Sequence, residues 1–501
     1  MGSLSEKLNG AKGKRVMMGS GFVTAIFNTV ALLIIARNAG PTILGSLGFM
    51  LAYMGLFLFI GDLGYGLVFG RLLDRGFSFG RCYRAFLMAK VRLTLSMGLI
   101  SGILIAVYAY ALAPDSHTAL HPVAMLMILG YYMMVNLAGI WVLSMKLRKR
   151  RPLPHDLVDS LVKVVMVVGL FMLFNPRGDQ ELIFRLCFIY LIAGTLTMML
   201  VRNSARGLKL GEKDEEIEVE FHDSARKFIP FIAFSALILN IDKVALWMAS
   251  DFTTLGIFFG AQRITIFIAA SAAMIEAMLG DAISRYIKEN NTEGISKSLR
   301  MTERYISLMA IPVATFYVFF SDSLLKAFLG SQFIGGGVAV SLLAGAGVFI
   351  TLATPHLSYL LRADKTRELT MIAGTGFAVM LGILAILLPD LVLPDADIHG
   401  MNGTAIAVLA SSVSMFITAR YVTWRMLGCK PHPRMLNHLL SAGLMMATIQ
   451  FIVRYFSIEV NVAWILGLAV IGFFVYIMCL YLTGEMVRKD YHEFRNVIKP
   501  E

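Results

Sequence analysis

Charge is scarce in this sequence. Only 16% of its 501 residues are Asp, Glu, Lys or Arg, whereas 57% are hydrophobic and the mean hydropathy is +0.72. A soluble globular protein of this length would carry considerably more charge to cover its surface. The shortage excludes a soluble protein and predicts an all-α polytopic membrane protein.

Motifs of enzyme chemistry are also missing. The sequence contains no HExxH zinc motif, no GxSxG nucleophile elbow, no P-loop and no paired CxxC. Its four cysteines do not suggest a disulfide framework. We therefore expect no catalytic residues, no cofactor and no metal site. Without an ATP site, any work must come from an ion gradient, the membrane potential or the substrate gradient.

Long apolar runs recur from Val16 to Leu482. A helix rises about 1.5 Å per residue, so a run of about 20 residues crosses a bilayer core. The runs predict about fourteen transmembrane helices. The first run is too long for a signal peptide and should be kept as a helix. The predicted spans are 16–37, 44–70, 86–112, 121–145, 156–174, 182–201, 228–250, 254–280, 302–320, 333–361, 368–388, 401–424, 437–457 and 462–482.

The basic residues predict how these helices are oriented. All but nine of the 45 lysines and arginines fall in segments that face the cytoplasm if the N-terminus is inside. This bias is typical of cytoplasmic loops. An even number of spans then places both termini in the cytoplasm of a multi-pass cell membrane protein. Because the basic residues are spread over many loops, the net charge of +12 indicates contact with membrane lipids and not with nucleic acid.

The chain divides near its middle. Short outer loops leave no room for an extracellular catalytic domain, and the longest inner connector, 202–227, is mixed in charge. PTILG (41–45) and FTTLG (252–256) match at an offset of 211 residues, which predicts a duplication of six helices. We expect a six-helix lobe over 1–210, a linker over 211–227, a second six-helix lobe over 228–430, and helices 13 and 14 with a tail over 431–501.

Charges inside predicted spans are candidate functional residues, because such charges usually face a partner or a wet cavity. NIDKV (240–244) places Asp242 and Lys243 in the seventh span. Arg263 lies at a matching depth, about 13 Å below the outer surface, in the eighth. We expect an Asp242–Arg263 ion pair. It could be purely structural or could take part in substrate or ion binding. Adjacent helical residues point about 100° apart, so Lys243 should have a different role.

Two more cations lie in predicted spans of the N-terminal half. Arg37 closes the first span at the outer interface, where it could line a cavity or extend harmlessly to the surface. Lys163 follows Asp159 by four residues, which favours a local i,i+4 ion pair over a role in the cavity.

Three ionisable residues lie toward the inner ends of their spans. Asp62, in FIGDLGYG, is close to Arg71 and is expected to cap the loop. Glu276 and Arg420 are expected at the membrane interface, with ion coupling or substrate contact as the alternative.

Cations outnumber anions among the deep residues. Arg37, Lys163, Lys243 and Arg420 are counted as uncompensated, although Asp159 is a local partner for Lys163. Such an excess suits a cavity that receives a phosphate or diphosphate, to which Arg offers paired donors and Lys a point charge. We expect Arg37, Lys163, Lys243, Arg263 and Arg420 to line a substrate cavity, and Asp242, Glu276 and Asp62 to form ion-coupling or structural pairs.

Seven stretches carry a resemblance to a known family: ARNAGPTILGSLGF (36–49), GDLGYGL (61–67), NIDKV (240–244), LGIFFGAQRI (255–264), LGSQF (329–333), LLRADK (360–365) and GMNGTAIAV (400–408). In these stretches, over about 400 residues, the sequence resembles the polysaccharide transporter family, the Wzx-like oligosaccharide flippases, of the multidrug/oligosaccharidyl-lipid/polysaccharide exporter superfamily. The resemblance implies a V-shaped pair of six-helix lobes that alternates between inward-open and outward-open states. It also implies roles for Arg37, Asp242, Lys243 and Arg263.

Three functional hypotheses follow. The resemblance favours a flippase that moves a polyprenyl-diphosphate-linked oligosaccharide from the cytoplasmic to the outer leaflet, with polysaccharide assembly proteins as partners and Na⁺ or H⁺ as a coupling ion. A cation-coupled multidrug antiporter is the alternative within the same superfamily. A membrane glycosyltransferase or polymerase acting on lipid-linked sugars is disfavoured by the short outer loops.

Overall fold

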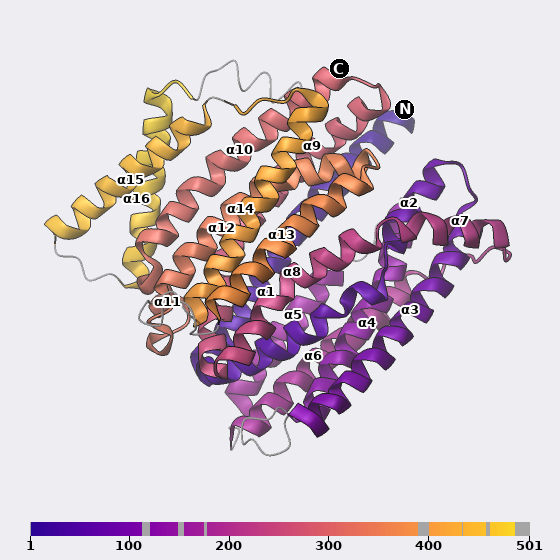
Figure 1. Ribbon diagram of the computed structural model, residues 1–501, viewed down its shortest axis with the longest axis horizontal. Helices are drawn as coiled ribbons and strands as arrows, with labels where there is room; N and C mark the ends of the chain where they lie inside the picture. Colours follow the sequence, from indigo (N-terminus) through magenta and orange to yellow (C-terminus); the bar gives the residue numbers. More distant parts are fainter. Residues whose placement is uncertain are drawn as a thin grey trace. The chain divides into compact units, whose positions relative to one another are not determined.

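The structure is a computed structural model that describes residues 2–112, 121–148, 155–174, 178–388, 400–432, 434–456 and 461–485. These segments form helices and no strands (Figure 1). Their bounds are α1 Gly2–Leu56, α2 Tyr65–Asp74, α3 Phe79–Val107, α4 Pro122–Leu147, α5 His155–Leu173, α6 Asp179–Ser204, α7 Glu215–Arg226, α8 Ile229–Ala249, α9 Phe252–Lys288, α10 Thr292–Phe319, α11 Ser321–Phe328, α12 Gly337–Arg362, α13 Thr366–Leu387, α14 Gly400–Leu427, α15 Met435–Tyr455 and α16 Val462–Leu482, with short helical turns at Leu58–Gly61, Tyr108–Leu112 and Ser331–Phe333.

The all-helical membrane fold predicted from composition is confirmed. In the described segments, 11 helices are long and apolar enough to cross a membrane, or 12 if α10 and α11, which meet at 85°, count as one span. The predicted count is higher partly because α1 enters this total as one span, whereas the sequence predicts two helices there. Helix α1 contains a break at Gly40, whose φ of 78° and ψ of 178° are not helical. The charged helix α5 is absent from the set of apolar spans.

The chain forms two compact units, unit 1 over Met1–Gly256 and unit 2 over Ile257–Glu501. In unit 1, α4 packs against α3 and α6, while α1 packs against α5 and α8. In unit 2, α14 packs against α12 and α13, and α10 packs against α12. Helices α15 and α16 pair with each other and contact the rest of unit 2 mainly through α10 (Figure 1). The domain boundaries expected from the sequence stay a prediction.

Helix α3 shows how these helices divide their surfaces. Leu95, Leu99 and Ile103 are four residues apart and are 60%, 68% and 55% exposed, so they form an apolar stripe. The opposite face buries polar groups, including Lys90 and Thr94. A soluble helix would place the apolar stripe inside. In a bilayer the reverse is stable, because lipid solvates the leucines and polar side chains need partners inside the protein.

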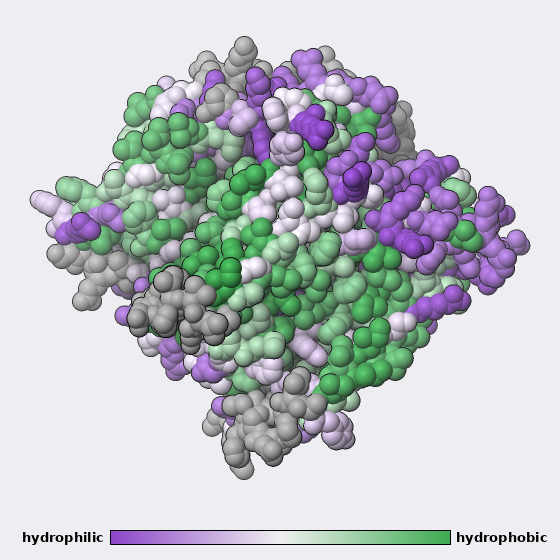
Figure 2. All heavy atoms as spheres, in the orientation of Figure 1, coloured by the Kyte–Doolittle hydropathy of each residue, from purple (hydrophilic) through white to green (hydrophobic). Residues whose placement is uncertain are grey.

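Hydrophilic residues are concentrated at one end of unit 1. In Figure 2 they gather over α7, whereas the surface over α3 and α4 is largely hydrophobic. Helix α7 is amphipathic and has three glutamates in its first turn, where the helix dipole favours acidic groups. The connector between α6 and α8 therefore contains a polar surface helix.

The two matched stretches of the sequence repeat lie against each other in unit 1. The Oγ1 atoms of Thr42 and Thr253 are 2.9 Å apart, and these residues differ by the offset of 211. The contact is reciprocal. A Cβ on Gly45 would be 1.8 Å from the carbonyl oxygen of Phe252, and a Cβ on Gly256 would be 1.8 Å from the carbonyl oxygen of Pro41. The two stretches thus pack closely against each other through matching positions.

Candidate functional site

A broken helix in unit 1 places an acidic side chain inside the protein. After α1 the chain makes a short helical turn, Leu58–Gly61, and then passes through Leu63 and Gly64, whose φ angles of 43° and 88° are left-handed, before α2 begins. Asp62 lies in this break, and its Oδ1 accepts a 2.8 Å hydrogen bond from Lys90 Nζ. Broken helices in membrane proteins are stable only where the protein supplies partners of this kind.

Lys90 is the central charge of this site. Its Nζ also donates to Asn136 Oδ1 at 2.6 Å, and its side chain is 6% exposed, against 34% for Asp62. Asp62 therefore forms an ion pair with Lys90 on α3, and its expected role as a cap of the loop stays a prediction. Lys90 is a buried residue of α3.

Lys163 is enclosed by three polar or aromatic groups. It bonds to Asp159 Oδ2 at 2.5 Å, which confirms the predicted i,i+4 pair, and to the hydroxyl of Tyr131 at 2.6 Å. Its Nζ also lies 4.4 Å and 4.7 Å from the ring centroids of Tyr131 and Tyr190. Cation–π contacts of this kind stabilise a desolvated ammonium group. The ammonium group of Lys163 is surrounded by these partners, which favours a structural role for this residue.

Asp242 and Lys243 bond to each other. Lys243 Nζ donates to Asp242 Oδ1 at 2.8 Å and to the carbonyl oxygen of Leu239 at 2.8 Å, and both side chains are buried. Adjacent residues on a helix point about 100° apart. The lysine side chain is nevertheless long enough to bend back to its neighbour. Asp242 belongs to unit 1 and Arg263 to unit 2. The ion pair expected between them stays a prediction.

The other predicted site residues differ in their surroundings. Arg37 is exposed. The guanidinium carbon of Arg263 lies 4.5 Å from the ring centroid of Phe259, one helical turn earlier. The side chain of Glu276 lies outside the described part of the structure. Arg420 is not an isolated interfacial cation: it donates through Nη1 to Glu303 Oε1.

Glu303 joins three helices of unit 2. Its Oε1 on α10 accepts from Arg420 on α14 and lies 2.7 Å from His356 Nε2 on α12. The carboxylate and the imidazole are almost completely buried. The other imidazole nitrogen, Nδ1, lies 2.9 Å from the hydroxyl of Thr423. Buried charges need such complete pairing to be tolerated.

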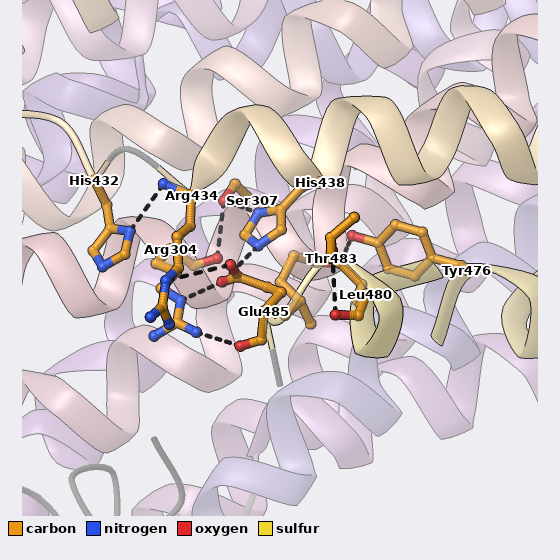
Figure 3. Close-up of polar contacts among 10 residues, drawn as sticks. Arg304, Ser307, His432, Arg434, His438, Tyr476, Leu480, Thr483 and Glu485 are labelled. Atoms are coloured by element: carbon orange, nitrogen blue, oxygen red, sulfur yellow. Dashed lines mark hydrogen bonds and ion pairs between the residues drawn. The ribbon is translucent and has the colours of Figure 1, made fainter. Parts of the chain in front are cut away.

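Glu485 forms a second buried cluster at the end of α16 (Figure 3). Its Oε1 accepts from Arg304 Nε and lies 3.2 Å from His438 Nε2, and its backbone carbonyl accepts from Arg304 Nη2 at 2.7 Å. His438 Nδ1 lies 2.8 Å from the hydroxyl of Ser307. This cluster connects α10, α15 and the segment after α16.

These contacts overturn the argument from unpaired cations. Of the four cations counted as uncompensated, Lys163, Lys243 and Arg420 each bond to a carboxylate. Two of the anions, Asp159 and Asp242, are close in the sequence to the lysines that they bind, Lys163 and Lys243. A count of charges does not pair them. Glu303 is at the start of the predicted span 302–320. In the structure α10 begins at Thr292, so Glu303 lies about three turns into the helix.

Sequence analysis did not single out the Glu303 and Glu485 clusters. One signal could have found them. RYIS (304–307) and RYVT (420–423) each place a hydroxyl three residues after an arginine, and each supplies the Arg and hydroxyl of one cluster. Their glutamates and histidines come from distant parts of the chain, so the pattern reveals only half of each cluster.

Comparison with known proteins places the fold. No family model and no curated protein matches the sequence. The structure is similar to the lipid II flippase MurJ in an inward closed conformation, with a TM-score of 0.74 at 12% identity over 93% of this chain and 98% of that chain. It is also similar to an inward-facing multidrug resistance MATE family transporter of the MOP superfamily, with a TM-score of 0.62 at 14% identity over 81% and 94% of the two chains.

A third similar structure is a MOP superfamily transporter from Pyrococcus furiosus, described as having a binding pocket of reverse polarity that suggests a different function. Its TM-score is 0.60 at 12% identity, over 83% of this chain and 94% of that one. The chain therefore has the same fold as these flippase and transporter structures. At these identities the likeness establishes the fold, and the Wzx-like assignment stays a prediction.

Proposed function

We propose that the protein is a flippase that moves a lipid-diphosphate-linked oligosaccharide from the cytoplasmic to the outer leaflet of the cell membrane by alternating access, for the synthesis of a surface polysaccharide or glycan. The observation that carries this proposal is the likeness to a lipid II flippase over nearly the full length of both chains. The resemblance of sequence stretches such as 36–49 and 240–244 supports the same function. Both termini would lie in the cytoplasm.

Three of the five candidate cations are bonded to carboxylates in the structure. Lys163, Lys243 and Arg420 would each have to leave a carboxylate to bind the diphosphate, and breaking a buried pair costs about 3–5 kcal/mol. Arg37 is exposed and Arg263 packs on an aromatic ring, and a guanidinium can bind phosphate through two donors. We infer that Arg37 and Arg263 contact the diphosphate, because each can offer two guanidinium donors to one phosphate, and that Lys163, Lys243 and Arg420 brace the helices around it.

Translocation in liposomes tests this function. Purified protein is reconstituted with a fluorescent undecaprenyl-diphosphate oligosaccharide, and the fraction open to an added glycosidase is followed over time. We expect the protected fraction to decrease, and Arg37→Ala and Arg263→Ala to slow this decrease at least tenfold. Arg454→Ala, at the far end of α15, serves as the matched arginine control. A protected fraction as constant as that in protein-free liposomes would refute the proposal.

A cation-coupled multidrug antiporter is the second candidate, because a MATE family transporter shares this fold. It predicts efflux of cationic dyes that stops when the Na⁺ or H⁺ gradient is collapsed and that is lost in Asp242→Asn. Dye efflux without translocation of the lipid-linked sugar would favour this candidate over the flippase.

A further inference from the structure

Two clusters in unit 2 repeat one arrangement of four groups. In each, an arginine and a histidine Nε2 share one carboxylate oxygen, and the histidine Nδ1 faces a hydroxyl three residues after the arginine on the same helix. The first cluster consists of Arg420, Thr423, His356 and Glu303, and the second of Arg304, Ser307, His438 and Glu485. The repeated geometry indicates a common chemical property.

The carboxylate fixes the proton on one imidazole nitrogen. An ionised carboxylate only accepts hydrogen bonds, so Nε2 of His356 must carry hydrogen to bond to Glu303 at 2.7 Å. The same holds for His438 and Glu485 at 3.2 Å. The state of each histidine then depends on Nδ1 alone.

The hydroxyl allows Nδ1 to exist with or without a proton. When Nδ1 is bare, the Thr423 hydroxyl donates to it at 2.9 Å. When Nδ1 is protonated, the hydroxyl can accept from it and donate instead to the carbonyl oxygen of Ala419, at 3.0 Å. In the second cluster, Ser307 has the carbonyl oxygen of Arg304 at 2.9 Å as its alternative acceptor. A hydroxyl rotation therefore accommodates the proton while every heavy atom keeps its contacts.

The charges of the first cluster leave room for one added proton. Glu303 and Arg420 cancel, so the first cluster is neutral when His356 is neutral and carries one positive charge when it is protonated. Oε2 of Glu303 is buried and has no hydrogen-bond partner among the described residues, so the carboxylate has unused capacity to stabilise an imidazolium. Oε2 of Glu485 is also buried, with Arg434 Nε 4.0 Å away.

Other titratable groups border both clusters. Cys429 accepts through its carbonyl oxygen from Arg420 Nη2 at 3.4 Å, and burial raises the pKa of its thiol. The positive charge of Arg300 also interacts electrostatically with this thiol. His432 lies beside Arg304 and Glu485, and burial, followed by the field of Arg304, lowers its pKa. Tyr476 interacts with Glu485 as well. At pH 7 these groups are either positively charged or neutral. Among the described residues that contact the two imidazoles, Glu303 and Glu485 are therefore the anions.

We propose that each cluster is a proton-binding site whose exchangeable proton occupies Nδ1 of its histidine, His356 in one and His438 in the other. Unit 2 then takes up two protons in its folded state, one between α10, α12 and α14 and one between α10, α15 and the end of α16. A proton gradient would act directly on this unit. The proposal does not depend on which substrate is moved.

Solid-state NMR of the full-length protein in bilayers tests the proposal. Imidazole ¹⁵N shifts distinguish neutral from doubly protonated histidine, and they are recorded on histidine-labelled protein from about pH 4.5 to about pH 9. We expect two buried histidines to convert between the Nε2–H form and the doubly protonated form while the protein stays folded. His356→Gln and His438→Gln each remove one of the two signals and so assign them.

A matched pair of threonine variants tests the role of the hydroxyl. Thr423→Val removes the group that accepts from protonated Nδ1, so we expect the midpoint of His356 to fall by about one pH unit. Thr404→Val is the control, because Thr404 is buried on the same helix and its hydroxyl bonds to the carbonyl oxygen of Gly400. If both histidines keep one protonation state over the range in which the wild-type protein is folded, the proposal is wrong, and the proposed flippase function is unaffected.

Discussion

Asp62 and Lys90 share a hydrogen bond, but their exposure to solvent differs. Because the Lys90 side chain is 6% exposed and that of Asp62 34%, only Asp62 can regain water when its partner is lost. We expect Asp62→Ala to lower the free energy of unfolding by about 3–5 kcal/mol, since it leaves a buried cation. Lys90→Met should cost clearly less. Thermal unfolding in detergent measures both.

The double variant Asp62→Ala/Lys90→Met provides the control for this pair. It removes both charges and should unfold at a higher temperature than Asp62→Ala alone. If Lys90→Met is as destabilising as Asp62→Ala, the ranking by exposure is incorrect.

Lys163 and Lys243 have different surroundings and should respond differently to substitution. Lys163 contacts Asp159, the Tyr131 hydroxyl and two aromatic rings, so Lys163→Ala should chiefly reduce thermal stability. Lys243 bonds to its neighbour Asp242 in a segment that resembles a family signature. We expect Lys243→Ala to slow translocation more than Lys163→Ala does. Equal and full translocation by the two variants would remove Lys243 from the site.

Single residues could be assigned from the sequence where their partners are local. The pair of Lys163 with Asp159 follows from a spacing of four on one helix. The partners of Glu303 and Glu485 could not be predicted, because Arg420 is 117 residues from Glu303 and Arg304 is 181 residues from Glu485. Such pairs depend on which helices pack together, and hydropathy does not encode this.

At the scale of elements, the contact between the start of α9 and the second part of α1 requires glycine. A methyl group on Gly45 or on Gly256 would lie 1.8 Å from a backbone carbonyl oxygen, which cannot move as a side chain can. We expect Gly45→Ala and Gly256→Ala each to destabilise the protein by about 1–3 kcal/mol or more. Folded yield and thermal unfolding in detergent measure the effect.

Gly139→Ala is the matched control for these variants. Gly139 is also helical, and a Cβ there meets no atom within 4 Å. Alanine is the better helix former, so this change should be neutral or slightly stabilising. Wild-type stability of Gly45→Ala would show that the two segments are not in close contact.

Helices with uniform apolar composition could be located from the sequence, whereas breaks and turns could not. The predicted spans at 401–424, 437–457 and 462–482 closely match α14, α15 and α16. The predicted span 44–70 is interrupted between α1 and α2, where Leu63 has a positive φ. A leucine gives no sequence signal for that conformation, which the surrounding structure imposes.

At the scale of the whole molecule, orientation in the membrane is open to a labelling experiment. The four native cysteines are buried, so they should react weakly with a membrane-impermeant maleimide. Ser204→Cys and Ser331→Cys place exposed thiols on segments predicted to be cytoplasmic and external. In intact cells we expect Ser331→Cys to be labelled and Ser204→Cys to be labelled only after permeabilisation. The opposite pattern would invert the topology.

The fold class of the whole chain could be predicted because it depends on composition and on length alone. A protein with 57% hydrophobic residues and repeated long apolar runs has few alternatives to a helical membrane bundle. The function of its buried charges could not be derived from a count of cations and anions. The neutral pairs around Lys163, Lys243 and Arg420 depend on three-dimensional packing that such a count ignores.

Glu303 and Arg304 are neighbours on α10 whose side chains enter different clusters. Turning this helix about its long axis would pull the acid away from α14 and, in the same movement, the base away from the segment after α16. Shifting the chain by one residue would put like charges opposite each other in one of the two places, Arg304 against Arg420 in one direction or Glu303 against Glu485 in the other. The rotational register of α10 is thus fixed twice over, and any rearrangement of unit 2 must carry this helix along without twisting it.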